Sequence, residues 1–155
     1  MTTLLLLLLI FPAAGAAAAA LLGPARRDAV RWVSLAATGF TLAASISVAV
    51  GYLSLPPHDG ARTFQPEFVP GAPADGAHAT TWDLLKLRHG AAIQFYVGID
   101  GLNLWLVVLT ALLMVAGVLI SWTSVTERDN EFFAWLLALE VAMIGVFASF
   151  DIILF

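Results

Sequence analysis

The sequence predicts an all-α, polytopic membrane protein with four membrane-spanning helices and one long polar loop. Hydrophobic residues make up 61% of the 155 residues and charged residues 12%, against about 45–50% and 25% in soluble domains. Mean hydropathy is +0.92. Four strongly apolar runs cover 4–22, 32–55, 101–122 and 132–155. At about 1.5 Å per residue, each run is long enough to cross a hydrocarbon core of roughly 30 Å as a helix.

The first run, 4–22, carries no charged residue. A cleaved signal peptide is the alternative, but it needs positive charge before its apolar core, and Met1, Thr2 and Thr3 supply none. We therefore predict a retained helix that begins outside the cell and ends at Gly23 and Pro24.

The second run, 32–55, carries small residues at every fourth position, which places them on one helix face. Small residues at this spacing allow a neighbouring backbone to approach closely in a membrane. The alternative is an alanine-rich helix with no special face. The candidate packing residues are Gly39, Ala43, Ser47 and Gly51.

The segment 56–100 is a polar, extracytoplasmic loop that holds five of the seven prolines. Residues 63–69 and 93–97 are predicted as two short strands of a β-hairpin, and 81–88 as a short amphipathic helical turn. The loop also holds all three histidines, His58, His78 and His89. They are too scattered to predict a metal site.

The third run, 101–122, follows Asp100 and Gly101. Aspartate before an apolar run is a good N-cap, because its carboxylate accepts hydrogen bonds from backbone N–H groups that lipid would leave unpaired. We predict a structural cap at these two residues.

The fourth run, 132–155, contains two acids, Glu140 and Asp151. Glu140 lies about 13 Å into this helix, where an acid must be neutral, paired or next to water, and where acids usually serve function. The alternative is a protonated acid that donates one hydrogen bond to a neighbouring helix. Asp151 lies about three turns further along the same face, close to the outer interface. Both are candidates for a proton pathway, with Asp151 in a supporting position.

Basic residues predict the orientation. The short loops 23–31 and 123–131 carry four arginines, whereas the 45-residue loop 56–100 carries three basic residues. The positive-inside rule then places the short loops in the cytoplasm. The net charge of −4 argues against nucleic-acid binding. With no cysteine, and no histidine in an apolar run, the chain is expected to bind no metal and no redox cofactor.

Two stretches carry a resemblance to a known family. Residues 97–110, with Asp100, Gly101 and Asn103, resemble a helix of the antiporter-like proton-pumping subunits of respiratory complex I. Ser121, Trp122 and the residues from Glu131 to Phe155, which include Glu140 and Asp151, resemble the subunit M family of NADH–quinone oxidoreductase. The resemblance is good over 93–155, whereas 1–55 agrees in helix layout only.

The resemblance implies that residues 1–155 are the N-terminal part of a longer membrane subunit in the inner membrane of a bacterium. Family members continue beyond the position of Phe155 to an essential glutamate, and Glu140 does not correspond to that residue. The subunit would help couple NADH oxidation by quinone to proton translocation, and it would not be catalytic alone. NADH, FMN, iron–sulfur clusters and quinone would be bound by partner subunits, and the chain would contact other membrane subunits and the lipid bilayer. Alternatives are a subunit of a cation/proton antiporter or a membrane-bound hydrogenase, or a four-helix membrane scaffold without enzymatic role.

Overall fold

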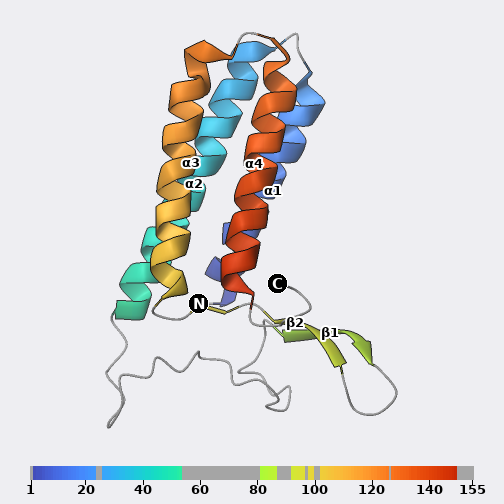
Figure 1. Cartoon of the computed structure of the whole chain (residues 1–155), viewed down its shortest axis with the longest axis vertical. Coiled ribbons are helices and arrows are strands. Elements are labelled where there is room, and N and C mark those ends of the chain that lie inside the picture. The colour runs from blue at the N-terminus through green and yellow to red at the C-terminus, as the bar shows by residue number, and fades with distance from the viewer. Residues whose placement is uncertain are drawn as a thin grey trace.

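The computed structural model describes residues 2–23, 26–53, 81–86, 92–96, 98–99, 102–125 and 127–149. Within these residues, four helices stand side by side as a bundle, with a two-stranded antiparallel sheet at one end (Figure 1). The elements in chain order are α1 (Thr2–Leu22), α2 (Arg27–Leu53), β1 (Thr81–Lys86), β2 (Ala92–Tyr96), α3 (Asn103–Ser124) and α4 (Asp129–Ala148).

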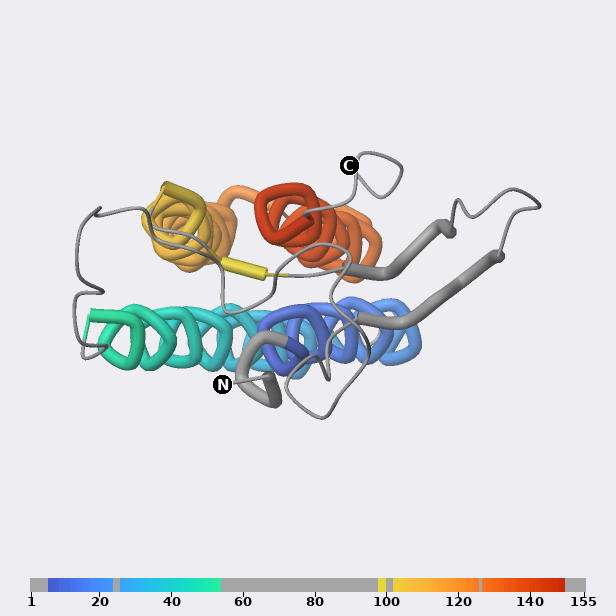
Figure 2. The backbone as a smooth tube through the Cα atoms, turned by 90° about the horizontal axis from the view of Figure 1, so that it is seen from below, coloured from blue at the N-terminus to red at the C-terminus, as the bar shows by residue number. Residues whose placement is uncertain are grey.

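The bundle has two layers of two helices each. Viewed from below, α1 and α2 form one layer, and α3 and α4 form the other (Figure 2). Each helix packs against its two neighbours, and α2 also contacts α4 across the diagonal. α1 and α3 end, and α2 and α4 begin, at the same end of the bundle, which we call the loop end. The loop end lies opposite the sheet (Figure 1).

Hydropathy and length make three of these helices candidate membrane spans. Among the described residues, α2, α3 and α4 are long and apolar enough to cross a bilayer, and Leu6–Leu22 of α1 is a shorter apolar stretch. A helix suits lipid because it satisfies its own backbone hydrogen bonds. Gly23 follows α1 with a φ of +67°, a left-handed conformation that glycine adopts without steric cost and that commonly ends helices.

Three helices begin earlier than the apolar runs predicted. α1 begins at Thr2 rather than at 4. α2 begins at Arg27 rather than at 32, and α4 begins at Asp129 rather than at 132. The first turns of α2 and α4 carry the acids Asp28, Asp129 and Glu131, which interact favourably with the unpaired N–H groups of a helix N-terminus. The helices therefore extend past the apolar run into polar sequence. α4 ends at Ala148, and the predicted remainder, 150–155, lies outside the described residues.

The sheet corrects one prediction in the long loop. β1 pairs antiparallel with β2, with Thr81 opposite Tyr96 and Lys86 opposite Ala92. The predicted helical turn over 81–88 is therefore wrong for 81–86, because cross-strand pairing satisfies the backbone groups that a helix would otherwise pair locally. β2 overlaps the predicted strand 93–97, whereas its predicted partner, 63–69, lies outside the described residues.

The buried apolar side chains form two clusters at different heights in the bundle. The loop-end cluster consists of Ala19, Val30, Ala37, Val118, Phe133 and Leu137. The sheet-end cluster consists of Leu8, Ala44, Val48, Ala49, Ile99, Leu104, Val107 and Ile144. Beside the second cluster, the Gly98 amide donates to the Ala148 carbonyl over 2.9 Å, which ties the segment before α3 to the end of α4.

Candidate functional site

Four buried polar side chains lie in the middle of the bundle, between the loop-end cluster and the sheet-end cluster. Each is within four residues of a cluster residue on its own helix, so the group occupies the middle of the bundle rather than either end. We call this group the polar layer, and its members are Thr38 and Thr41 on α2, Thr110 on α3 and Glu140 on α4.

A close helix crossing fixes the height of this layer. A Cβ built on Gly15 of α1 would lie 2.5 Å from the Ala37 Cβ and 3.3 Å from the Leu137 Cδ1. The backbone of α1 therefore lies directly against α2 and α4 at this level. α2 and α4 run in the same direction, away from the loop end (Figure 1). One turn further along them come Thr41 and Glu140, which places these two residues at about the same height.

Glu140 is completely enclosed by the bundle. Its side chain is 0% exposed, and neither carboxyl oxygen has a hydrogen-bond partner in the structure. An uncompensated carboxylate in such surroundings would be very unfavourable, because it loses hydration without gaining a partner. The arrangement therefore holds a neutral carboxylic acid.

The helices around Glu140 bring no opposite charge to its level. The described stretches of α1 and α3 contain no charged residue. The arginines of α2 are Arg27 and Arg31, in its first two turns, and the other acids of α4, Asp129 and Glu131, lie in its first turn. Asp129 is eleven residues from Glu140, about 16 Å along the axis.

The three threonines of the polar layer bond to their own helices. The Thr41 hydroxyl donates to the Ala37 carbonyl over 2.9 Å, and the Thr110 hydroxyl donates to the Leu106 carbonyl over 2.8 Å. The Thr38 hydroxyl is 3.1 Å and 3.2 Å from two carbonyls of the preceding turn. Back-bonding of this kind lets a hydroxyl sit in an apolar interior without an unpaired proton.

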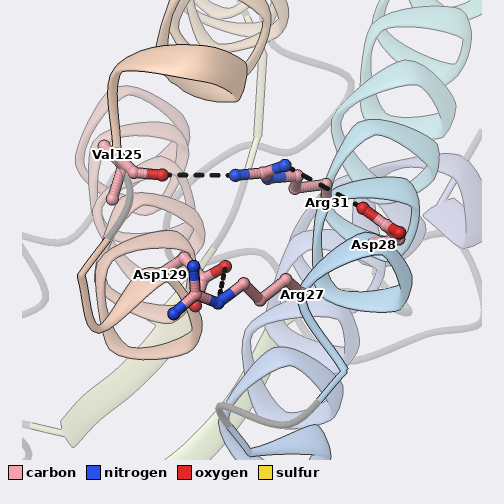
Figure 3. Close-up of polar contacts among 5 residues, drawn as sticks. All are labelled: Arg27, Asp28, Arg31, Val125 and Asp129. Carbon is pink, nitrogen blue, oxygen red and sulfur yellow. Dashed lines mark hydrogen bonds and ion pairs between the residues drawn. The ribbon is translucent and has the colours of Figure 1, made fainter.

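A second polar group joins the two layers at the loop end (Figure 3). The Arg31 guanidinium donates from Nη2 to the Val125 carbonyl over 3.3 Å, and its Nη1 lies 3.9 Å from Asp28 Oδ1. The Arg27 Nε lies 3.9 Å from Asp129 Oδ2. Two arginines of α2 thus contact the end of α3 and the start of α4.

Asp129 is the buried member of this group. Its side chain is 1% exposed, whereas Arg27 is 55% exposed. Because Arg27 is largely exposed and the separation is long, the pair contributes only about 0–1 kcal/mol. The place of Asp129 in the first turn of α4 adds about 0.3–1 kcal/mol through the helix dipole. The loop-end group therefore joins the two helix layers, and Asp129 contributes modestly to that junction.

The predicted small-residue face of α2 lies on the outside of the bundle. Ala43 and Ser47 are exposed, Gly39 and Gly51 are partly exposed, and a Cβ on Gly39 would meet nothing within 4 Å. This face therefore packs against none of the described helices, and its role as a packing face stays a prediction. α2 instead turns a different face inward, with Ser34, Ala37, Thr38, Thr41, Ala44, Ser45, Val48 and Ala49 buried.

Other predicted residues lie outside the described part of the chain. These are Asp151, Asp100, Gly101 and the loop histidines. The N-cap position of α3 is occupied by Leu102, which makes no side-chain cap hydrogen bond. Among the described residues, no group of three or more His, Cys, Asp or Glu side chains is placed to hold a metal ion.

The structure adds polar residues to which the sequence gave no packing or site role: Thr38, Thr41, Arg27, Arg31 and Asp129. A signal for the threonines was present. Ser34, Thr38, Thr41 and Ser45 recur at intervals of four, three and four residues, the spacing of one helix face. For Asp129, the sequence before the apolar run resembles an exposed loop, and only the tertiary structure shows that this side chain is buried.

The chain is similar to membrane subunits of respiratory enzymes. It is 35% identical over 127 residues to NADH-quinone oxidoreductase subunit M of Escherichia coli (strain K12), a match that covers 81% of this chain and 22% of that protein. It is 43% identical over 60 residues to NADH-ubiquinone oxidoreductase chain 4 of Metridium senile, covering 39% of this chain and 12% of that protein.

A third relative is named for a different electron donor. The chain is 33% identical over 63 residues to F(420)H(2) dehydrogenase subunit M of Methanosarcina mazei, covering 41% of this chain and 13% of that protein. The chain thus spans about a fifth or less of the length of these relatives. No model of a known protein family matches it.

Proposed function

Because the chain belongs to the antiporter-like membrane subunits of complex I, the family of subunit M and chain 4, we propose that it forms part of a membrane subunit of a proton-pumping NADH–quinone oxidoreductase. In that role its helices line or support one proton channel. The observation that carries the proposal is Glu140, an acid fully enclosed in the middle of an apolar bundle. Acids inside membrane helices are rare and usually serve ion or proton pathways.

The proposal includes a membrane topology of four spans. α1 is a helix of 21 residues, which matches the thickness of a bilayer core as well as α2, α3 and α4 do. The loop end carries Arg26, Arg27, Arg31 and Arg128, so the positive-inside rule assigns this end to the cytoplasm of a bacterial cell. The N-terminus and the sheet then lie outside, and Trp32 and Trp122, which pack edge to face at 5.4 Å, lie near the cytoplasmic interface.

In the proposed complex, partner subunits carry out electron transfer. This chain contributes no cysteine, and its apolar helices contain no histidine, so its helices offer neither thiolate nor imidazole ligands to an iron–sulfur cluster or haem. NADH, FMN, the iron–sulfur clusters and quinone are then bound elsewhere in the complex. The chain supplies buried helices and a protonatable group, and lipid and other membrane subunits cover its outer faces.

Glu140 is the proposed protonatable group of these four helices. Its enclosure means that no side chain from outside the bundle reaches it in this arrangement. Proton uptake or release therefore requires water or a rearranged hydrogen bond at the polar layer, because a carboxylate without a partner would be strongly disfavoured there. Asp151, which lies outside the described residues, remains a candidate for a supporting position.

Replacing Glu140 by Gln in the full subunit tests this role. Glutamine preserves the size of the side chain and cannot release a proton, so we expect fewer protons translocated per NADH oxidised, measured in vesicles with the assembled complex. The matched control is Glu131→Gln, an exposed acid of the same helix, which should leave that ratio unchanged. An unaltered ratio in assembled Glu140→Gln complex would contradict the proposed role.

The relative from Methanosarcina mazei favours a second candidate, a membrane subunit of a dehydrogenase with another electron donor. The two candidates share the membrane role of this chain and differ in the partner that oxidises the donor. Purification of the assembled complex through a tag on this subunit distinguishes them. Recovery of NADH-oxidising flavin and iron–sulfur subunits supports the first candidate, and their absence from an intact complex supports the second.

A further inference from the structure

The threonine hydroxyl groups of the polar layer are all engaged as donors. In the polar layer, the Thr41 hydroxyl donates to Ala37 and the Thr110 hydroxyl donates to Leu106, and Thr38 bonds to the turn before it. A hydroxyl has one proton and two acceptor lone pairs. Each threonine therefore offers an acceptor to a neighbouring acid, but no free proton.

This arrangement distinguishes the two protonation states of Glu140. A neutral carboxylic acid has a proton to donate and can use a threonine oxygen as its acceptor, whereas a carboxylate only accepts hydrogen bonds. Within the described helices, the charged groups of α2 and α4 other than Glu140 are all at the loop end, and α1 and α3 carry none. A carboxylate at Glu140 therefore needs a donor. A threonine hydroxyl supplies one only if it leaves the backbone carbonyl to which it is bonded and turns toward the carboxylate.

Thr41 is the threonine best placed for this exchange. Ala37 and Leu137 both lie against Gly15, and Thr41 and Glu140 each follow one turn later on helices that run in the same direction. Threonine in a helix populates two χ1 rotamers, because its hydroxyl bonds to the preceding turn in one of them. The Glu140 carboxyl has no hydrogen-bond partner in the structure. Its three rotatable side-chain bonds leave it free to turn toward a hydroxyl at the same level, directly or through one water.

We propose that Thr41 is a positioning residue for Glu140, whose hydroxyl accepts a hydrogen bond from the neutral acid and donates one to the carboxylate. When the acid gives its proton to water, the Thr41 hydroxyl leaves the Ala37 carbonyl and turns toward the carboxylate. When the acid regains a proton, the hydroxyl returns. No bond to carbon changes and no electron moves. This inference rests on the proposed function for its role in proton transfer, but the hydrogen bond itself is independent of that function.

The experiment uses three variants of the full subunit in the assembled complex. Thr41→Val keeps the shape and removes the hydroxyl, Thr41→Ser keeps a hydroxyl, and Ser47→Ala is the control. Ser47 lies on the exposed side of the same helix and donates to the Ala43 carbonyl. The measurements are the protons translocated per NADH oxidised and the infrared carbonyl-stretching band of the protonated Glu140, identified as the band that Glu140→Gln removes.

We expect Thr41→Val to shift the Glu140 band to higher frequency, because the carbonyl stretch rises as hydrogen bonding weakens, and to lower the proton ratio. Thr41→Ser should restore most of both properties, and Ser47→Ala should change neither. A band that stays in place in assembled Thr41→Val complex would overturn the inference, even if proton translocation fell. A shifted band together with normal translocation in Glu140→Gln would support the hydrogen bond and refute the proposed channel role of Glu140.

Discussion

Gly15 provides the sharpest test of how the bundle packs. A methyl group added at this position would place its carbon 2.5 Å from the Ala37 Cβ and 3.3 Å from the Leu137 Cδ1. Favourable contacts between carbon atoms lie at about 3.5–4.0 Å. The leucine methyl can turn away, but the Ala37 Cβ is fixed to the backbone of α2. We therefore expect Gly15→Ala to push α1 and α2 apart by about 1 Å.

The expected cost follows from the surroundings of this contact. Ala19 of α1 and Val30 and Ala37 of α2 belong to the loop-end cluster, so separation of the helices loosens their contacts as well. Gaps of 0.5–1 Å already lose a quarter to a half of a dispersion contact. Overpacking in a well-packed core typically costs about 1–3 kcal/mol, and the better helix propensity of alanine returns at most about 1 kcal/mol. The net loss in the free energy of unfolding should be about 1–2 kcal/mol.

Denaturation in detergent micelles, followed by helical circular dichroism, measures this loss. Gly39→Ala and Gly117→Ala are matched controls, because a Cβ at either glycine meets nothing within 4 Å, and each should be neutral or slightly stabilising. Ala37→Gly combined with Gly15→Ala should recover part of the packing, which a double-mutant cycle detects. If Gly15→Ala unfolds like the two controls, the close crossing of α1 with α2 and α4 is incorrect, and the level assigned to Thr41 and Glu140 fails with it.

Two further predictions concern the stability of the loop end and the orientation of the chain in the membrane. Asp129→Asn should lower the free energy of unfolding by about 0.3–2 kcal/mol, through the lost pair with Arg27 and the lost helix-dipole interaction. Asp28→Asn, at an acid that is 94% exposed, should change the free energy of unfolding by no more than about 0.5 kcal/mol. Equal losses would contradict the burial of Asp129. The chain has no cysteine, so single Glu127→Cys and Asp75→Cys variants report topology through a membrane-impermeant thiol reagent. In intact cells Asp75→Cys should be labelled and Glu127→Cys protected, and the reverse pattern would refute the proposed orientation.

Local sequence predicted the helices and singled out Glu140 as an acid inside an apolar run. Long runs without charge determine helices in lipid, because no other conformation of a single segment satisfies its backbone there. One acid in such a run stands out for the same physical reason, since its desolvation is unfavourable wherever the helix packs. Neither inference needed the neighbours of the helix. Residues 97–110 and 131–155 also carried the family resemblance, which the similarity to subunit M confirmed.

Only the tertiary structure decided which helix faces point inward. In a membrane both the interior and the exterior of a bundle are apolar, so hydrophobic periodicity does not mark the buried face. The spacing of Gly39, Ala43, Ser47 and Gly51 suggested one face of α2, whereas the packing of α1, α3 and α4 buries another, with Thr38 and Thr41. Cross-strand pairing likewise made a strand of 81–86. The sequence determined that four apolar helices form and that Glu140 lies inside the apolar stretch of the fourth. Packing between helices, which hydropathy cannot encode, decided that this acid is enclosed by the bundle and that the buried threonines bond to their own helices.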